Sequence, residues 1–293
     1  MRHALDFISS DDPNTKLFFE PDIEIDYIMT RNFHIPVDKE KALANGTVKP
    51  EDSILILDSL PFRVPSPTLS KGEWMVLEII AANNWERPIY WTSCQHSGTA
   101  GLDDYLQFEG TAYRLVPIKT PSESILLTGR IDADSLYDRL MNIFRWEGVN
   151  NPDVWLDSHH LRTLSVVRAR HIYTRLAMQL LSEDKTERAV EVLNRALELF
   201  PASKIAYDYF SLFQAEALYL AEMTDVANLE LIAYADRLLS EIDYFYSLPP
   251  VFFKSVEQKA EVNVELLIQI IDISQSHGQE QIGEHIRQSL GSK

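Results

Sequence analysis

The residues best suited to binding chemistry lie in one short segment, residues 83–91 (NNWERPIYW). An indole can stack on a sugar ring or an apolar side chain, while amides and a guanidinium hydrogen bond to hydroxyl and carbonyl groups. We therefore take Asn83, Asn84, Trp85 and Arg87 as candidate ligand-binding residues. A structural interpretation explains the same segment, with the amides ending a helix, the tryptophans packed in a core and Arg87 paired with a carboxylate.

A second group of polar side chains follows the strand expected at residues 89–92. Asp103 and Tyr105 belong to a glycine-containing loop, and Glu109 and Arg114 come next along the chain. Loops at the carboxyl ends of strands often hold ligands in α/β proteins, so we add these four residues to the candidate site. Paired carboxylates can also act as acid and base, but no second catalytic group accompanies them in the sequence.

The remaining reactive residues lack the spacing that catalysis or metal binding needs. His159 and His160 are adjacent, whereas metal ligands on one helix face stand three or four residues apart. Cys94 is the only cysteine, which excludes an intrachain disulfide and a thiolate cluster. Ser93, Cys94 and His96 have no evident orienting partner for nucleophilic catalysis. We expect no catalytic residue, no metal and no cofactor in this chain.

The composition limits the partners. The chain carries 27 Lys and Arg against 44 Asp and Glu, a net charge of −17. An acidic chain without a basic stripe is a poor partner for nucleic acid or anionic lipid. No apolar run approaches the roughly 20 residues of a membrane-spanning helix, and acidic residues follow Met1 too soon for a signal peptide. We expect the chain itself to be soluble, without direct membrane insertion.

The elements that position the candidate site form a small α/β region with few strands. Ser70 and Glu73 make a capping-box pattern, which predicts a helix ending at Asn83. Apolar runs predict strands at residues 53–57, 89–92 and 113–116, the second of them buried. Asp132 is expected to begin another helix, which continues through Phe144. Asn45-Gly46 predicts a tight turn, although Asn45-Gly46-Thr47 also matches a glycosylation sequon.

The second half of the sequence follows a helical-repeat pattern. An aromatic residue, a leucine and a small residue recur with the spacing of a tetratricopeptide helix pair, and a looser second unit follows. Small residues matter because helices approach closely only where side chains are short. A chance helical hairpin is the alternative. The residues that carry the pattern are Tyr173, Leu176, Ala177, Leu180, Ala189, Leu193, Ala196 and Pro201, then Ala215, Leu218, Ala227 and Leu231.

These patterns predict an α+β chain of two domains. Residues 1–155 form a small α/β domain, and residues 156–293 form an all-α, tetratricopeptide-like helical repeat domain. A long helix is expected after Pro249-Pro250, with Val264, Leu267 and Ile271 on its apolar face.

Several segments together resemble a known family. Residues 69–80 and 83–91, with residues 35–38, 101–106, 109–110 and 113–118, look like the soluble C-terminal region of a family of bacterial polytopic membrane proteins. That family is grouped with glycosyltransferases of type-C membrane architecture, similar to protein O-mannosyltransferases. The resemblance covers nearly the whole chain and is most specific over residues 69–118.

The resemblance implies an extracytoplasmic (periplasmic) location at a bacterial inner membrane, beside a membrane-helix bundle of the same full-length protein. The family's catalytic carboxylates lie in that bundle, so no catalytic residue transfers to this sequence and the fragment is expected to be inactive alone. Its client would be a polypeptide or glycan acceptor. Two alternatives remain open: a free-standing tetratricopeptide-like scaffold for protein or peptide binding, and a soluble carbohydrate-binding module that uses Trp85 and Trp91.

Overall fold

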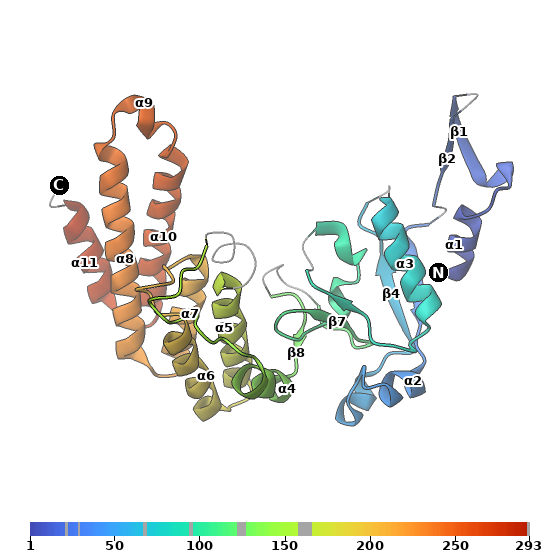
Figure 1. The fold of residues 1–293 in the computed structure, drawn as a ribbon, viewed down its shortest axis with the longest axis horizontal. Coiled ribbons are helices and arrows are strands. Elements are labelled where there is room, and N and C mark those ends of the chain that lie inside the picture. The colour runs from blue at the N-terminus through green and yellow to red at the C-terminus, as the bar shows by residue number, and fades with distance from the viewer. Residues whose placement is uncertain are drawn as a thin grey trace. The chain divides into compact units, whose positions relative to one another are not determined.

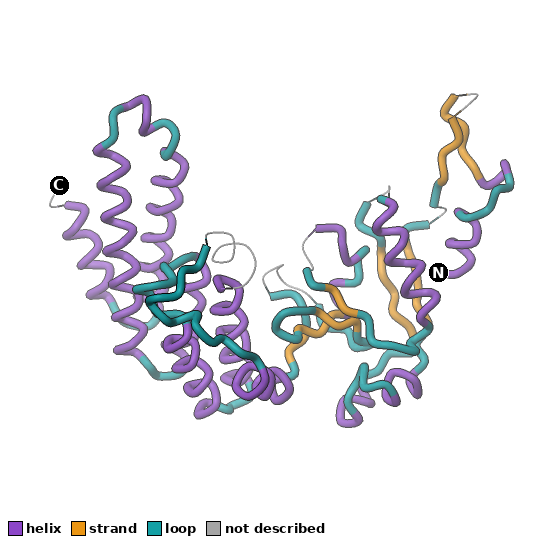
Figure 2. Tube along the Cα trace, viewed as in Figure 1, coloured by secondary structure: helices purple, strands orange, loops and turns teal. Residues whose placement is uncertain are grey.

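The computed structural model describes residues 1–20, 23–28, 30–66, 69–93, 96–121, 127–157 and 166–291. The chain folds as two compact units, Met1–Asp132 and Ala133–Lys293. The first unit mixes small sheets with helices and the second is helical, so the chain is α+β (Figures 1 and 2). The division falls before the helix that begins at Ala133, whereas the sequence pattern places it at residues 155/156.

The first unit combines short strands with helical turns. Its helices are α1 (Arg2–Ile8), α2 (Lys39–Ala44) and α3 (Lys71–Asn83), and its 3-10 turns are η1 (Pro13–Thr15), η2 (Pro50–Leu55), η3 (His96–Thr99) and η4 (Asp103–Tyr105). Its strands are β1 (Lys16–Glu20), β2 (Ile23–Asp26), β3 (Asn32–Pro36), β4 (Ser59–Arg63), β5 (Tyr90–Trp91), β6 (Leu106–Phe108), β7 (Tyr113–Leu115) and β8 (Arg130–Ile131).

Within the described ranges these strands form three sheets. β1 pairs with β2 and β3 with β4, both antiparallel, and the third sheet has the order β5-β7-β6-β8. In the third sheet β7 is antiparallel to β5 and β6, and β6 is parallel to β8. Gln107 faces Arg114 on one side and Arg130 on the other, so these three side chains share one face of the sheet.

The predicted helix after Ser70 is confirmed in detail. The Ser70 hydroxyl accepts a hydrogen bond from the backbone N–H of Glu73 at 3.2 Å, and the Glu73 carboxylate accepts one from the backbone N–H of Ser70 at 2.7 Å. This capping box satisfies two N–H groups that the first turn leaves without helical partners. Asn84 ends the helix in the left-handed conformation, at φ 42°.

Two strand predictions need correction. Residues 53–57 are not a strand, because Pro50 begins the 3-10 turn η2 and Ile54 is 90% exposed. The strand at residues 89–92 exists as β5 but is not buried: it is an edge strand, and Tyr90 is 51% exposed. The strand at residues 113–116 is confirmed as β7.

The core of the first unit gathers side chains from its three α-helices, from strands β3, β4 and β7, and from the loops between them. The β3–β4 pair, the inner face of α3 and the loop before β6 all contribute. Its buried members are Leu5, Phe33, Ile35, Ala42, Leu60, Phe62, Val64, Leu77, Ile80, Trp85, Ala100, Leu102, Tyr105 and Leu115.

The second unit is a series of packed helices. It contains α4 (Ala133–Asp138), a π-helical turn η5 (Arg139–Ile143), α5 (Val166–Ser182), α6 (Thr186–Leu199), α7 (Tyr209–Leu220), α8 (Thr224–Ser247), α9 (Pro250–Phe253), α10 (Glu257–Ser276) and α11 (Glu280–Gly291). α5 packs against α6 and α7, and α8 packs against α7, α10 and α11. The helix predicted from Asp132 through Phe144 is present, but its second half is π-helical.

The side chains that the repeat pattern assigns to the interior are buried. This holds for Tyr173, Leu176, Ala177, Leu180, Ala189, Leu193 and Ala196, and for Ala215, Leu218, Ala227 and Leu231. The helix after the proline pair is α10, and Leu267 is buried in it, but Val264 is 41% exposed and does not belong to the apolar face. Among the residues that the structure describes, no helix is long and apolar enough to cross a membrane.

Candidate functional site

The corner after α3 is built around Trp85. Asn84 and Trp85 both have positive φ, 42° and 59°, and this turns the chain back under the helix. The Trp85 indole is 6% exposed, and its Nε1–H donates to the carbonyl of Pro36 at 2.7 Å. The side-chain amide of Asn45 donates to the carbonyl of Trp85, also at 2.7 Å. The indole thus has the contacts of a core residue with a satisfied polar atom.

A shallow recess lies beside this corner. Asn83, Trp85, Arg87, Thr47 and Leu115 are among the residues that line it, and its volume is about 10 Å³. A volume of this size admits roughly one water molecule. The Asn83 side-chain amide donates to the carbonyl of Arg87 at 2.8 Å and so closes the turn. As it stands, the recess is too small for a sugar ring.

The loop that precedes β6 is held by its own side chains. Asp103 accepts a hydrogen bond from the Thr99 hydroxyl at 2.9 Å. Tyr105 is 2% exposed and its hydroxyl donates to the carbonyl of Pro61 at 2.7 Å. Burial, and secondarily the charge of Asp104, raises the pKa of Tyr105 above its ordinary value. Asp103 therefore holds the loop together, and Tyr105 braces it against β4.

Glu109 and Arg114 are brought together as a buried ion pair. Nη2 of Arg114 lies 2.8 Å from Oε1 of Glu109, with the side chains 11% and 5% exposed. Nη1 of Arg114 donates to the carbonyl of Gly46 at 2.7 Å. The guanidinium therefore ties the β6–β7 hairpin to the turn at Asn45-Gly46.

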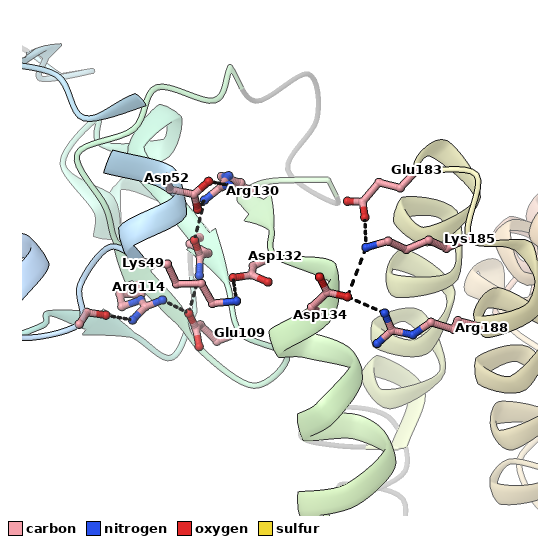
Figure 3. A network of polar contacts seen from close by, with 12 residues as sticks. Lys49, Asp52, Glu109, Arg114, Arg130, Asp132, Asp134, Glu183, Lys185 and Arg188 are labelled. Carbon is pink, nitrogen blue, oxygen red and sulfur yellow. Dashed lines mark hydrogen bonds and ion pairs between the residues drawn. The ribbon is translucent and has the colours of Figure 1, made fainter. Parts of the chain in front are cut away.

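This pair extends into a network that the sequence pattern does not predict. The Gln107 amide donates to Glu109 at 2.9 Å and accepts from Arg130 at 3.3 Å. Arg130 makes two hydrogen bonds with Asp52, of 2.7 and 2.8 Å (Figure 3). Asp52, Gln107, Glu109, Arg114 and Arg130 thus form one polar network across the sheet face, which we call the sheet network. Its only signal in the sequence is the polar Gln107 between two apolar strand residues.

Each unit has further ion pairs of its own. In the first unit, Lys49 lies 2.7 Å from Asp132. In the second unit, Asp134 of α4 accepts from Lys185 at 3.2 Å and also pairs with Arg188 of α6 (Figure 3). Both cations lower the pKa of Asp134, Arg188 through the larger contribution. The contacts of Asp134 fix α4 against the start of α6.

Seven of the eight candidate residues fall into three separate groups, and the eighth, Asn84, ends α3. Asn83, Trp85 and Arg87 line the recess, Asp103 and Tyr105 brace a loop, and Glu109 and Arg114 pair inside the sheet network. Trp85 and Tyr105 share one core but bond to different carbonyls. The expected ligand position at a strand end does not apply, because that rule describes parallel sheets and β5 is antiparallel to its neighbour.

Other candidate groups are absent or lie outside the described residues. Cys94, His159 and His160 lie outside them. Within the part of the chain that the structure describes, no group of three or more His, Cys, Asp and Glu is placed to hold a metal ion.

The second unit contains a buried arginine at the connection between α6 and α7. Arg170 of α5 is 2% exposed; Nη2 donates to the carbonyls of Ile205, at 2.9 Å, and Phe200, at 3.4 Å, and Nη1 to the Ser211 hydroxyl at 3.0 Å. Asp208, the N-cap of α7, lies 3.6 Å away. Burial lowers the pKa of Arg170 and raises that of Asp208. Arg170 therefore fixes the connection between two helix pairs.

Comparison with known families gives a match for the N-terminal part of the chain. Residues 1–135 match the family described as TMEM260-associated domain 2. Neither the curated proteins nor the solved structures compared with the chain match it significantly. The matched range nearly coincides with the compact unit Met1–Asp132. The first unit is therefore similar to a domain associated with a transmembrane protein family.

Proposed function

We propose that this chain is a non-catalytic accessory region of a membrane-embedded glycosyltransferase of protein O-mannosyltransferase type. The observation that carries the proposal is the match of residues 1–135 to a domain associated with a transmembrane protein family. Two parts of the proposal rest on the resemblance of residues 69–118 to the glycosyltransferase family. These are the transfer of a sugar and the location on the extracytoplasmic (periplasmic) side of a bacterial inner membrane. In this proposal the chain holds an acceptor polypeptide or glycan for an active site in the membrane-helix bundle.

The internal pairing of the first unit supports a structural role. The side chains of Trp85, Tyr105, Glu109 and Arg114 each make a hydrogen bond or ion pair within the unit. A unit braced in this way is a rigid body rather than an open catalytic cleft. Its outer helix α3 presents Met75 and Ile79, 51% and 53% exposed and one turn apart, which suits contact with the membrane-helix bundle.

We further propose that α5 to α8 form two tetratricopeptide-like helix pairs that hold the client. The support is the complete burial of Ala177 and Ala196 in the first pair and of Ala227 in the second, since small residues allow close helix packing. The candidate client surface lies on α5 and α7. There the centres of the His171 and Phe210 rings lie 4.5 Å apart, and the centres of the Tyr209 and Phe213 rings lie 5.3 Å apart. Tyr209 is 44% exposed.

The test compares the complete membrane protein with a version that lacks residues 1–293, in membranes supplied with a lipid-linked sugar. We expect the deletion to abolish transfer to a polypeptide while hydrolysis of the lipid-linked sugar persists. Tyr209→Ala in the complete protein should raise the KM for the polypeptide and leave that for the sugar donor unchanged. Unchanged polypeptide transfer after the deletion would refute the accessory role.

The alternative is a free-standing scaffold that binds a protein or peptide through the α5–α7 surface. The reading frame separates the two: membrane-spanning segments encoded in frame with the chain support the first, and a protein that carries none supports the scaffold. The third hypothesis, a carbohydrate-binding module, would need Trp85 to leave the core contact with Pro36. Glycan binding lost in Trp85→Ala, with folding intact, is the result that would favour it.

A further inference from the structure

The last turn of α8 and the connection that follows it to α10 form an uncharged apolar tip. Residues 244–253 read YFYSLPPVFF and include α9. Figure 1 shows α9 at the end of the α8–α10 pair. The exposed fractions are 61% for Tyr244, 66% for Tyr246, 83% for Val251 and 62% for Phe252. So much apolar surface gathered on one protruding connection marks an interaction site.

Several backbone groups of the tip are bonded within the tip itself. Pro249 and Pro250 have no N–H group. The N–H groups of Phe252 and Phe253 donate to the Pro249 carbonyl at 2.8 and 2.9 Å, and that of Leu248 donates to a carbonyl at the end of α8 at 3.2 Å. Backbone groups that enter a lipid phase must be bonded internally, because nothing there replaces water.

The hydroxyl groups at both ends of the tip are also bonded internally. The Ser247 hydroxyl donates to the carbonyl of Tyr244 at 2.7 Å, and the Ser255 hydroxyl donates to the carbonyl of Phe252 at 2.7 Å. These contacts lower the cost of moving the two serines out of water.

The charge pattern selects a neutral bilayer over an anionic one. The nearest charged residues, Asp243 and Lys254, flank the tip and are opposite in sign. The whole chain has a net charge of −17, so anionic lipid would repel it. Tyrosine favours the head-group level of a bilayer, and phenylalanine and valine favour its apolar interior.

We propose that the tip, residues 244–253, inserts into the interface of a zwitterionic lipid bilayer. Val251 and Phe252 enter the acyl-chain boundary, and Tyr244 and Tyr246 lie at the head groups. This inference rests on the proposed function only for the presence of a membrane near the chain. It departs from the expectation, drawn from the composition, that the chain makes no direct membrane insertion. Its chemistry comes from the tip itself, so it extends the accessory role by naming a lipid contact.

The test is flotation of the full chain with phosphatidylcholine vesicles. We expect the chain to float with the vesicles, and Val251→Ser/Phe252→Ser to lower its partition coefficient by at least about tenfold, because two apolar anchors are lost. The matched control is Leu229→Ser/Ile268→Ser, which removes two exposed apolar side chains, 69% and 53% exposed, from the bodies of α8 and α10. The control should float like the unchanged chain.

Adding phosphatidylglycerol should weaken binding, and salt should restore it, because the repulsion is screened. Equal flotation of both double variants would overturn the inference. A second outcome would also overturn it: neither the unchanged chain nor any variant binds vesicles, the chain sediments as a dimer, and Val251→Ser/Phe252→Ser makes it a monomer. The tip would then contact a second copy of the chain. Flotation measures vesicle binding and does not require sugar transfer. The deletion test can therefore refute the accessory role without affecting the flotation result, and the two failures are distinguishable.

Discussion

Asp52 and Arg130 lie 78 residues apart in the sequence and are joined by two hydrogen bonds of 2.7 and 2.8 Å. Asp52 belongs to η2, and Arg130 begins β8, the strand that pairs in parallel with β6. The pair therefore joins a helical turn to the last strand of the unit, and it extends the sheet network beyond Gln107 (Figure 3).

Arg130→Ala should destabilise the first unit. The side chains of Arg130 and Asp52 are 21% and 19% exposed, so the partner left behind keeps a partly desolvated charge. We expect the free energy of unfolding to fall by about 1–3 kcal/mol in urea denaturation followed by tryptophan fluorescence. Arg2→Ala is the control: its pairs with Asp6 and Glu78 are more exposed, since the Arg2 side chain is 59% exposed, and the change should cost less than Arg130→Ala, about 0.5–1 kcal/mol at most. Equal losses would contradict a bracing role for the sheet network.

Trp85→Ala should be among the most damaging substitutions in the first unit. It empties a core position and leaves the Pro36 carbonyl without its indole partner, so we expect a loss of about 3–5 kcal/mol in the free energy of unfolding. Trp155 is 83% exposed, and Trp155→Ala should change stability by less than about 0.5 kcal/mol. If Trp85→Ala left stability unchanged but removed glycan or peptide binding, Trp85 would be a ligand-binding residue instead.

Gly101→Ala should be costly, whereas Gly98→Ala should not. Gly101 has φ +91°, and a Cβ at this position would overlap the carbonyl oxygen of Arg63. We expect a loss of about 1–3 kcal/mol or more in the free energy of unfolding, because the backbone must move to accept the methyl group. A Cβ at Gly98 meets no atom within 4 Å, so this substitution is the matched control in the same loop. A tolerated Gly101→Ala would mean that the loop is free to shift away from β4.

Structural features that depend on residues close together in the sequence were predictable. The capping box of Ser70 and Glu73 predicted the start of α3, and the spacing of Leu176, Ala177 and Ala196 predicted which side chains are buried. Both follow from local geometry: the cap acts within one turn, and helical periodicity fixes the buried face.

Features that depend on distant partners were not predictable. Residues 53–57 carry a strand-like apolar run, yet η2 forms there, and its Asp52 bonds to a strand far along the chain. The Glu109–Arg114 pair required the register of β6 with β7, and the Gln107–Arg130 contact required a parallel pairing with β8. Sheet order is set by tertiary packing, so neither contact could be derived from spacing alone.

Arg170→Ala should destabilise the second unit more than any surface arginine. Its guanidinium bonds to carbonyls at the α6–α7 connection and to Ser211, and the side chain is 2% exposed. We expect a loss of about 3–5 kcal/mol in the free energy of unfolding, and only partial rescue by Arg170→Lys, whose ammonium lacks the planar fork. Arg168→Ala, an exposed position on the same helix, is the control and should be close to neutral. Full rescue by lysine would show that charge alone, and not the fork, holds the connection.

Glu230→Gln should make the second unit less sensitive to pH. Burial raises the pKa of Glu230 above its ordinary value near 4.5, while Arg170 and Tyr207 oppose the shift. The folded state then binds this proton more tightly than the unfolded chain. The resulting stability is complete below the unfolded pKa and is lost as the pH rises through the folded pKa. Glutamine cannot ionise, so the variant should be more stable than the unchanged chain at pH 7.

The gain from Glu230→Gln should shrink as the pH falls to about 4, where the glutamic acid is itself neutral. Thermal unfolding followed by circular dichroism at pH 4 and pH 7 measures the difference. Glu261 is exposed on α10, and Glu261→Gln is a control that makes the same chemical change at an exposed position. A gain from Glu230→Gln that is equal at both pH values would contradict burial as the cause, because an effect of burying charge must vanish where the charge does.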